Sequence, residues 1–427
     1  MSEIRVTSVV GENGSDPVGL STGFTVGPTS GTTATITHEG QVSFTGIVTA
    51  TSFVPTVGQL SHRNIIINGA MLISQRGTSA STTNGYGSVD RVRLSYNTSG
   101  VDEAPSQIQS NVSPPSSPYH LPTSGDHPYK EGFRKCFNIT NGNQTSGAGA
   151  DDFIKFQYRI EAQDIANSGW NYTDPNSFIT LSFWIKSSVA QNFYGYLETF
   201  DTSGYLYPFE TGSLSAFTWK KVTKTIPGNS NLTVNNDNGS GLQIEIQAFM
   251  GTNSTDSGVA LNTWAAYAPG TRTPDQTSTW FTTNDASLEI TGLQLEVGSV
   301  ATPFEHRSFG DELRRCHRYF FNIQGSTGYR TGISCYANSS SACRGVVYFP
   351  APMRANPTFS GSATAMVFDS ASDSASFNVN TISSSVANTN ALYNRAYLEV
   401  STSSMTAGQA GQLEFRATGF MNFSAEL

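Results

Sequence analysis

The sequence predicts an all-β protein with an N-terminal extended β anchor, a central antiparallel jelly roll or β-sandwich, a short linker helix and a C-terminal β-sandwich. Three observations support this prediction. Apolar and polar residues alternate along many short segments, as they do in strands with one buried face. Gly, Asn and Pro separate these segments at the spacing of turns. Charged residues are only 13% of the chain and aromatic residues are 11%, a composition that suits folded strands and excludes long helical bundles and disordered polymers.

Residues 1–61 form a segment with little apolar bulk. Short β-branched stretches alternate with Gly and Pro, and the aromatic residues are only Phe24, Phe44 and Phe53. Ordering the backbone costs about 1–2 kcal/mol per residue, which so few rings cannot offset in an isolated chain. We therefore expect this segment to anchor the protein, either interlaced with two other copies in a parallel homotrimer or bound to another protein.

Residues 62–309 carry the clearest strand patterns. Leu242, Ile244 and Ile246 alternate with polar residues, which gives that strand one buried side and one wet side. The strand-like segments are 63–77, 135–140, 152–165, 178–188, 192–200, 219–228, 242–250 and 286–298. About eight antiparallel strands predict a jelly roll or sandwich. The proline-rich segment 113–128 is expected to be a long surface loop.

One helix is expected, over residues 310–320. Acidic residues lie at its start and arginines toward its end, the arrangement that a helix dipole favours. On a helix, Leu313, Cys316 and Phe320 would form one apolar stripe. We expect this stripe to pack between the sandwich and residues 321–427, whose patterns predict a C-terminal β domain at the distal tip.

Charge and hydropathy exclude several classes of partner. The formal net charge is −8, and no basic run is long enough to follow a phosphate backbone, so nucleic acid is not an expected partner. No window approaches the ~20 apolar residues that span a bilayer. The first residues lack the pattern of a secretory signal, so we expect synthesis in a cytoplasm without membrane insertion.

No catalytic or metal-binding motif stands out. The chain lacks the sequence signatures of serine hydrolases, zinc proteases, phosphate loops and dinucleotide sites, so we expect no enzymatic activity and no cofactor. The oxygen-rich stretch 235–241 is interpreted as a hairpin turn, because it lacks the distal Glu of a calcium loop. Cys136, Cys316, Cys335 and Cys343 match no zinc spacing and are interpreted as buried free thiols, with a Cys335–Cys343 pair as the alternative.

Four aromatic residues in loop-like stretches are the candidates for ligand binding: Tyr205, Tyr207, Trp264 and Tyr267. Flat rings stack on the C–H faces of sugars, while amides and carboxylates bind the hydroxyl groups. The neighbours of these rings are Gly, Asn, Thr and Pro rather than aliphatic residues, which favours exposure. Packing in the core is the alternative for each of them.

Several motifs resemble those of bacteriophage tail fibre proteins. The stretch "NIIINGAMLISQRGTS…GYGSVDRVRL" over 64–94 resembles the N-x-x-x-N-G-x-M-x-x-x-Q-R-G…Y-x-x-D-R-W opening of tail fibre modules, with Val92 in place of the usual Trp. Residues 288–321 resemble the closing strand of the same module and the linker helix after it. The stretch "SFITLSFWIKSS…TWKKVTKTIPG" over 177–228 resembles carbohydrate-binding-module jelly rolls. The stretches "FTGIVTATSFVP" and "FSAEL" are similar to segments of cyanophage fibres.

The resemblance implies a tail fibre in the virion of a cyanophage-type virus, where it would attach the particle to its host. The expected partners are two further copies in a homotrimer, phage tail or adaptor proteins at the N-terminal segment, and a host surface glycan or lipopolysaccharide. A capsid or neck decoration fibre is the first alternative. A depolymerase spike is the second, although the sequence shows no repeat of ~20 residues of the kind that a β-helix spike contains.

Overall fold

The computed structural model describes three short strands in the first 61 residues and most of the chain beyond them. From residue 62 onward it describes all residues except 98, 116–126, 203, 326–331, 371–375, 386–393, 403 and 416–418. The chain divides into two compact units, Met1–Thr56 and Val57–Leu427. Most of the proline-rich segment 113–128, predicted as a surface loop, lies outside the described residues.

The described residues of the first unit form a small antiparallel sheet. Its strands β1 (Phe24–Val26), β2 (Ala34–Ile36) and β3 (Val42–Phe44) pair in sequence order. These strands agree with the extended β character predicted for the segment. The rest of residues 1–61 lies outside the described part of the chain, and the homotrimer stays a prediction.

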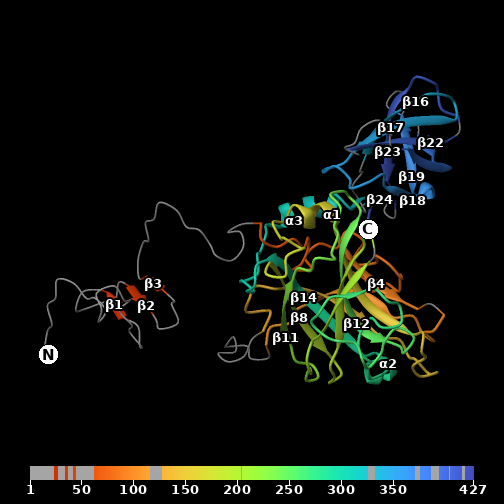
Figure 1. Ribbon diagram of the computed structural model, residues 1–427. Coiled ribbons are helices and arrows are strands. Elements are labelled where there is room, and N and C mark those ends of the chain that lie inside the picture. Colours follow the sequence, from red (N-terminus) through yellow and green to blue (C-terminus); the bar gives the residue numbers. More distant parts are fainter. Residues whose placement is uncertain are drawn as a thin grey trace, which may run out of the picture. The chain divides into compact units, whose positions relative to one another are not determined.

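Two antiparallel sheets form the central sandwich. The six-stranded sheet has the order β13 (Ala265–Ala266), β10 (Tyr205–Glu210), β9 (Tyr194–Thr199), β12 (Ser240–Met250), β7 (Phe153–Glu161) and β4 (Val92–Tyr96). The five-stranded sheet has the order β11 (Lys220–Pro227), β8 (Phe178–Ser187), β14 (Ser287–Val297), β6 (Lys135–Thr140) and β5 (Ser106–Asn111). Figure 1 shows β8, β11 and β14 on one side of this domain and β4 and β12 on the other.

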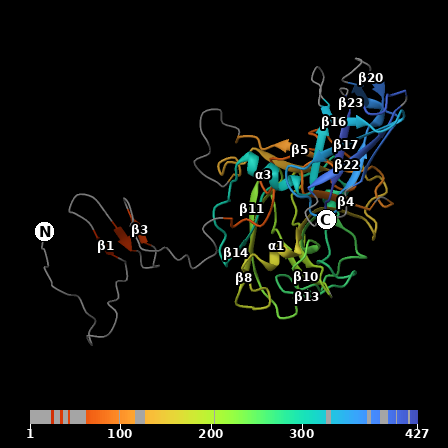
Figure 2. The same ribbon diagram turned by 90° about the horizontal axis from the view of Figure 1, so that it is seen from above.

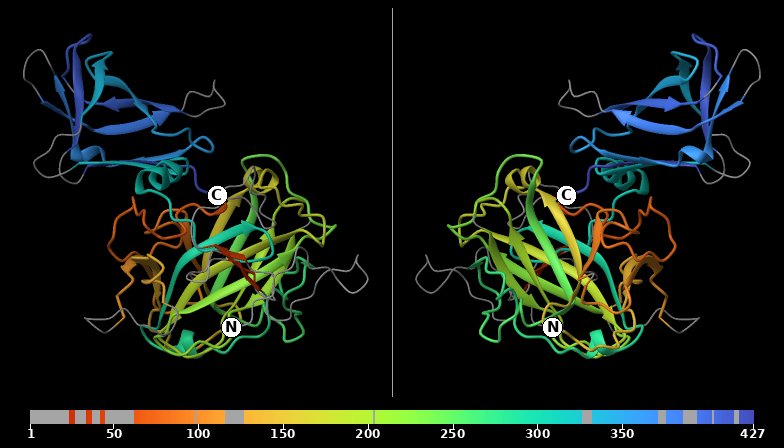
Figure 3. Two further views of the ribbon diagram at one scale, coloured as in Figure 1. Left: turned by 90° about the vertical axis from the view of Figure 1, so that its left-hand side faces the viewer. Right: turned by 90° about the vertical axis from the view of Figure 1, so that its right-hand side faces the viewer.

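The core lies between these two sheets. Ring centroids of Phe137 and Phe156 are 5.7 Å apart and those of Phe183 and Phe209 are 6.3 Å apart, and each pair joins one sheet to the other. The alternation predicted for β12 is confirmed, because Leu242, Ile244 and Ile246 are all buried in this core. Figure 3 shows the strands of the central sandwich, most of them coloured from yellow to green, from two opposite sides.

The segment 63–77, predicted as the first strand of the sandwich, is not a strand. Asn68 and Met71 have φ angles of 61° and 58°, which strand geometry does not allow. Asn64 donates from its side-chain amide to the carbonyl of Leu293, in β14. Asparagine side chains can bond backbone groups in this way and compete with sheet hydrogen bonds. The apolar run is therefore buried as an irregular segment.

The helix α3 (Phe309–His317) follows the sandwich where the sequence predicts a helix over 310–320. It ends earlier than predicted because a strand begins at Phe320. Of the predicted stripe, Leu313 and Cys316 pack in one cluster, whereas Phe320 lies in β15 (Phe320–Gln324) and outside that cluster, so the prediction is wrong for Phe320. Their cluster contains Ile67, Ile73, Cys316 and Tyr319, with Leu72, Leu313 and Leu427 at its edge. Two shorter helices, α1 (Ala162–Ala166) and α2 (Thr279–Thr282), lie at opposite ends of the sandwich, α1 near α3 (Figures 1 and 2).

The C-terminal residues form two more antiparallel sheets, as the sequence predicts. One has the order β15 (Phe320–Gln324), β24 (Phe420–Ser424) and β18 (Thr358–Gly361). The other has the order β20 (Ser376–Asn378), β19 (Met366–Ser370), β23 (Ala410–Phe415), β16 (Gly332–Ala337), β17 (Ala342–Tyr348), β22 (Arg395–Ser401) and β21 (Thr381–Ser385). A short 3-10 helix (Ala363–Ala365) precedes β19. Their shared core includes Phe368, Leu413 and Phe423.

All four cysteines are buried and carry free thiols, which agrees with the interpretation of the sequence rather than with a Cys335–Cys343 disulfide. Among the described residues, no helix has the length and apolar character needed to cross a membrane.

Candidate functional site

The six-stranded sheet has a polar face that is turned away from the core, although most of its side chains are buried. Alternate residues of a strand share a face of the sheet. The pairing of β12 with β7 and with β9 places the alternate residues of these three strands side by side. This polar face consists of Lys155, Gln157 and Arg159 on β7, Gln243, Glu245 and Gln247 on β12, and Tyr194, Tyr196 and Glu198 on β9. Thr273, from the segment after β12, donates to Gln247 at 3.0 Å and covers one end of the face.

Glu245 is the buried centre of the polar face, with a side chain that is 0% exposed. Its carboxylate lies 3.0 Å from the Lys155 ammonium and accepts a hydrogen bond of 2.8 Å from the amide of Gln157. The amide of Gln243 donates to the same carboxylate at 3.2 Å. A buried charge is stable only when it is paired and hydrogen-bonded, and these groups meet that requirement. Glu245 therefore forms a fixed support beneath the more accessible groups.

Glu198 lies near Glu245 and is half-buried, so it is more accessible than Glu245. Burial and the neighbouring Glu245 carboxylate raise the pKa of Glu198 to about 7, although Arg272 acts in the opposite direction. The amide of Gln243 donates to Glu198 at 3.3 Å. A raised pKa favours the protonated carboxyl group, which can donate as well as accept a hydrogen bond with a hydroxyl group.

Two rings lie beside arginines at this face. The Arg159 guanidinium is 5.3 Å from the ring centroid of Phe200, and that of Arg272 is 5.6 Å from the ring centroid of Tyr267. Arg272 also donates to the Tyr267 hydroxyl at 3.0 Å. Such contacts hold the rings and the guanidinium groups in place relative to one another. The arrangement places the exposed ring of Tyr267 beside the half-buried Arg272, whose charge acts on the half-buried Glu198.

The structure brings the four predicted ligand-binding residues to one edge of the six-stranded sheet. Tyr205 and Tyr207 are in β10, and Trp264 and Tyr267 flank β13, which pairs with β10. Tyr267 is 39% exposed and is the most accessible of the four. Tyr205 and Trp264 are half-buried against the core.

Tyr207 differs from the prediction, because its side chain is buried at 2% exposure. Odd-numbered residues of β10 face the core, and the Tyr207 ring packs 5.3 Å from that of Trp264. The Trp264 indole N–H donates to the carbonyl of Pro227 at 2.7 Å. These two rings join the sheet edge to the core, and Tyr207 offers no face for stacking on a ligand.

Sequence reasoning missed Arg159, Glu198 and Arg272. The alternation in 152–165 and 192–200 could have placed the first two on a polar strand face. The position of Arg272 could not be read from the sequence, because it lies in an irregular segment.

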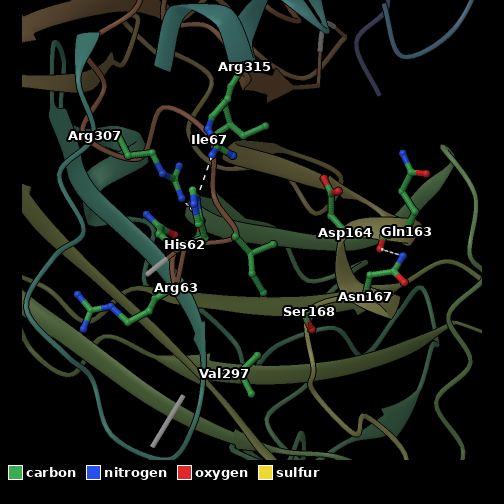
Figure 4. Close-up of a pocket in the computed structure, with 12 residues that line it drawn as sticks. His62, Arg63, Ile67, Gln163, Asp164, Asn167, Ser168, Val297, Arg307 and Arg315 are labelled. Carbon is green, nitrogen blue, oxygen red and sulfur yellow. Dashed lines mark hydrogen bonds between the residues drawn. The ribbon is translucent and has the colours of Figure 1, made fainter. Parts of the chain in front are cut away.

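A separate cavity of about 450 Å³ lies where α1 and α3 meet the start of the sandwich (Figure 4). Its ionisable lining residues are His62, Arg63, Asp164, Arg307 and Arg315. Arg307 donates to the carbonyl of Ile66 at 2.9 Å, and Arg315 lies 3.4 Å from the His62 ring nitrogen Nδ1. The arginines could attract an anionic group, but several are already bonded to the protein, and the described lining residues include no Phe, Tyr or Trp.

No family model and no curated protein matches this sequence. Similar solved structures include the enzymatically active domain of bacteriophage CBA120 tailspike protein 4, at 11% identity over 55% of this chain, with a TM-score of 0.27. This chain covers only 21% of that one. A family 11 carbohydrate-binding module from Clostridium thermocellum, in complex with a tetrasaccharide, matches at 10% identity over 53% of this chain and 99% of its own, with a TM-score of 0.22.

A tandem of family 22 carbohydrate-binding modules from Paenibacillus barcinonensis Xyn10C matches at 9% identity over 88% of this chain and 100% of its own, with a TM-score of 0.23. Likenesses this weak carry no argument about what the chain binds.

Proposed function

We propose that this chain is a non-catalytic fibre protein of a virus particle that attaches the particle to its host by binding a surface glycan. The observation that carries the proposal is the juxtaposition of Glu198 and Arg272 with the exposed ring of Tyr267. Sugars present hydroxyl groups around apolar C–H faces. A ring can stack on the C–H face, while the carboxyl and guanidinium groups bind hydroxyls.

The motifs of 64–94 and 288–321 support the viral fibre as the setting for such a site. In this setting the N-terminal segment would join three copies to tail or adaptor proteins. A single site with one stacked ring would bind weakly, with a Kd near ~1 mM. Three chains per fibre would raise the apparent affinity through effective concentration. A decoration fibre on the capsid or neck is the alternative setting, and locating the protein in the virion by electron cryomicroscopy separates the two.

The binding test uses full-length protein and a panel of purified bacterial surface polysaccharides. Tyr267→Ala should weaken binding of the best polysaccharide about fivefold, since one stacked ring contributes ~1 kcal/mol. Tyr267→Phe keeps the ring and should retain most of the affinity. Phe217→Ala is the matched control, because Phe217 is 73% exposed and lies outside the polar face. Binding that is equal in all three variants would contradict the proposed site.

The same panel tests the absence of catalysis. Polysaccharides incubated with the protein should release no reducing ends or short oligosaccharides. Release that is lost in Glu198→Gln would instead establish a depolymerase.

A further inference from the structure

The seven-stranded sheet of the C-terminal domain exposes three tyrosines on its outer face. Tyr336, Tyr348 and Tyr397 are 52%, 69% and 40% exposed. They are three of the seven large apolar or aromatic side chains that are exposed among the described residues, so accessible aromatic surface is concentrated on this sheet. Soluble proteins rarely cluster exposed rings without a binding role.

Strand register brings the three rings together. Strand β17 lies between β16 and β22, and Tyr336 is opposite Arg344, while Tyr397 is opposite Val346. Tyr348 follows Val346 by two positions and therefore shares its face. Directly opposite side chains lie about 5 Å apart, so Tyr397 is next to Val346 and Tyr336 is next to Arg344 on the same face.

A shallow cavity of about 590 Å³ lies over the three tyrosines. Its lining residues are Ser334, Cys335, Tyr336, Arg344, Gly345, Val346, Tyr348 and Tyr397. A volume of this size falls within the range of small-ligand sites, about 300–1,000 Å³.

Charged groups accompany the rings on the same face. Arg344 Nε lies 3.1 Å from a carboxylate oxygen of Glu399, and these side chains are 51% and 57% exposed. The pair leaves guanidinium donors and carboxylate lone pairs open to the solvent. Rings for C–H faces and an ion pair for hydroxyl groups together form a surface suited to a sugar.

We propose that this tyrosine platform, formed by Tyr336, Tyr348 and Tyr397 with Arg344 and Glu399, is a second saccharide-binding site. The inference rests on the proposed function and extends it from the central sandwich to the C-terminal domain. Each chain then contacts a surface polysaccharide at two places. Two weak sites on one chain bind a polymer more tightly than either site binds alone, because the second contact forms at a high local concentration.

A saccharide suits this face better than a second copy of the chain. A protein interface would remove the exposed Arg344–Glu399 pair from water, and that desolvation offsets much of the attraction between the charges. Interface centres are also depleted in acidic residues such as Glu399. A sugar laid across the rings leaves the ion pair partly hydrated.

The experiment compares full-length protein with the triple variant Tyr336→Ala, Tyr348→Ala and Tyr397→Ala. The probe is the polysaccharide of the panel that the unaltered protein binds best, measured by isothermal titration calorimetry. The triple variant should bind at least about tenfold more weakly, while the triple Tyr→Phe variant keeps the rings and most of the affinity. Phe309→Ala is the control, since Phe309 is 61% exposed and lies in α3. Melting curves of each variant confirm that it is folded.

Each remaining outcome overturns the platform. If the triple Ala variant binds normally while Tyr267→Ala is weakened, the platform is wrong and the proposed function stands. Sedimentation measures the oligomeric state of each variant. If only the triple Ala variant dissociates, the face is an interface between copies of the chain. If the unaltered protein binds no polysaccharide in the panel, both proposals fail together.

Discussion

Arg91 and Glu426 lie 335 positions apart in the sequence and form an ion pair whose side chains are only 1% and 5% exposed. Arg91 also donates to the carbonyl of Arg159 at 2.6 Å and lies 3.4 Å from the ring centroid of Tyr319. Arg76 adds a second contact to Glu426, at 3.2 Å. The "DR" of the opening motif and the "FSAEL" stretch therefore meet in space. Both stretches therefore contribute to packing between the central sandwich and the C-terminal residues.

Glu426→Ala should destabilise this junction strongly. Removing one partner leaves the buried Arg91 charge uncompensated, a loss of about 3–5 kcal/mol. Chemical denaturation followed by intrinsic fluorescence measures the free energy of unfolding. Glu399→Ala removes an exposed ion pair and should cost about 1 kcal/mol or less. Equal losses in the two variants would contradict the assigned role of Glu426.

Asn68 is a second position where the opening motif has a structural role. Its side-chain amide donates to the carbonyls of Ile73 and Asp90 at 2.9 Å, and its oxygen accepts from the Ile73 amide at 2.9 Å. Asn68→Gly should lower the free energy of unfolding by about 1–3 kcal/mol, because these buried groups lose their partners. Asn68→Ala should lose about 1–2 kcal/mol more, since the φ of 61° disfavours alanine. Urea midpoints of both variants test this order, and an alanine variant as stable as the glycine variant would refute the backbone argument.

Glu198 should make stability depend on pH in a defined direction. Its folded pKa of about 7 lies above its ordinary value of 4.5, so the folded protein holds the proton more tightly than the unfolded chain. The contribution of Glu198 to stability is therefore complete below pH 4.5 and is lost as the pH rises to about 7. Glu198→Gln cannot titrate and should lack this decline. Melting temperatures of both proteins between pH 4 and 8 measure the difference, and parallel curves would exclude Glu198 as its source.

The fold could be predicted from the sequence because its strands obey local rules. In β12, the alternation of Leu242, Ile244 and Ile246 with polar residues is a local pattern and fixes which side is buried. The segment 63–77 could not be predicted, because its shape depends on side-chain bonds from Asn64 and Asn68 to backbone groups far away in the sequence. An apolar run predicts a strand equally for β12 and for the segment 63–77, because it carries no information about these long-range bonds.

The candidate site could be predicted only in part for a related reason. Trp264 and Tyr267 are close in sequence and have similar neighbours, yet one donates to Pro227 from a half-buried position and the other is exposed. Which ring faces the solvent depends on the pairing of β13 with β10, a contact that composition does not reveal. The pairing of Arg272 with Tyr267 depends on the same long-range packing.

Substitutions at Tyr207 and Tyr267 should separate packing from binding. Tyr207→Ala removes a buried ring in contact with Trp264 and should lower the free energy of unfolding by about 3–5 kcal/mol. Tyr267→Ala removes a ring that is 39% exposed, so most of the stability should remain while attachment to cells weakens. Melting temperature and cell adsorption measured on the same two variants give opposite patterns under this assignment. A Tyr267→Ala variant that unfolds like Tyr207→Ala would place Tyr267 among the packing residues and leave the polar face without its aromatic contact.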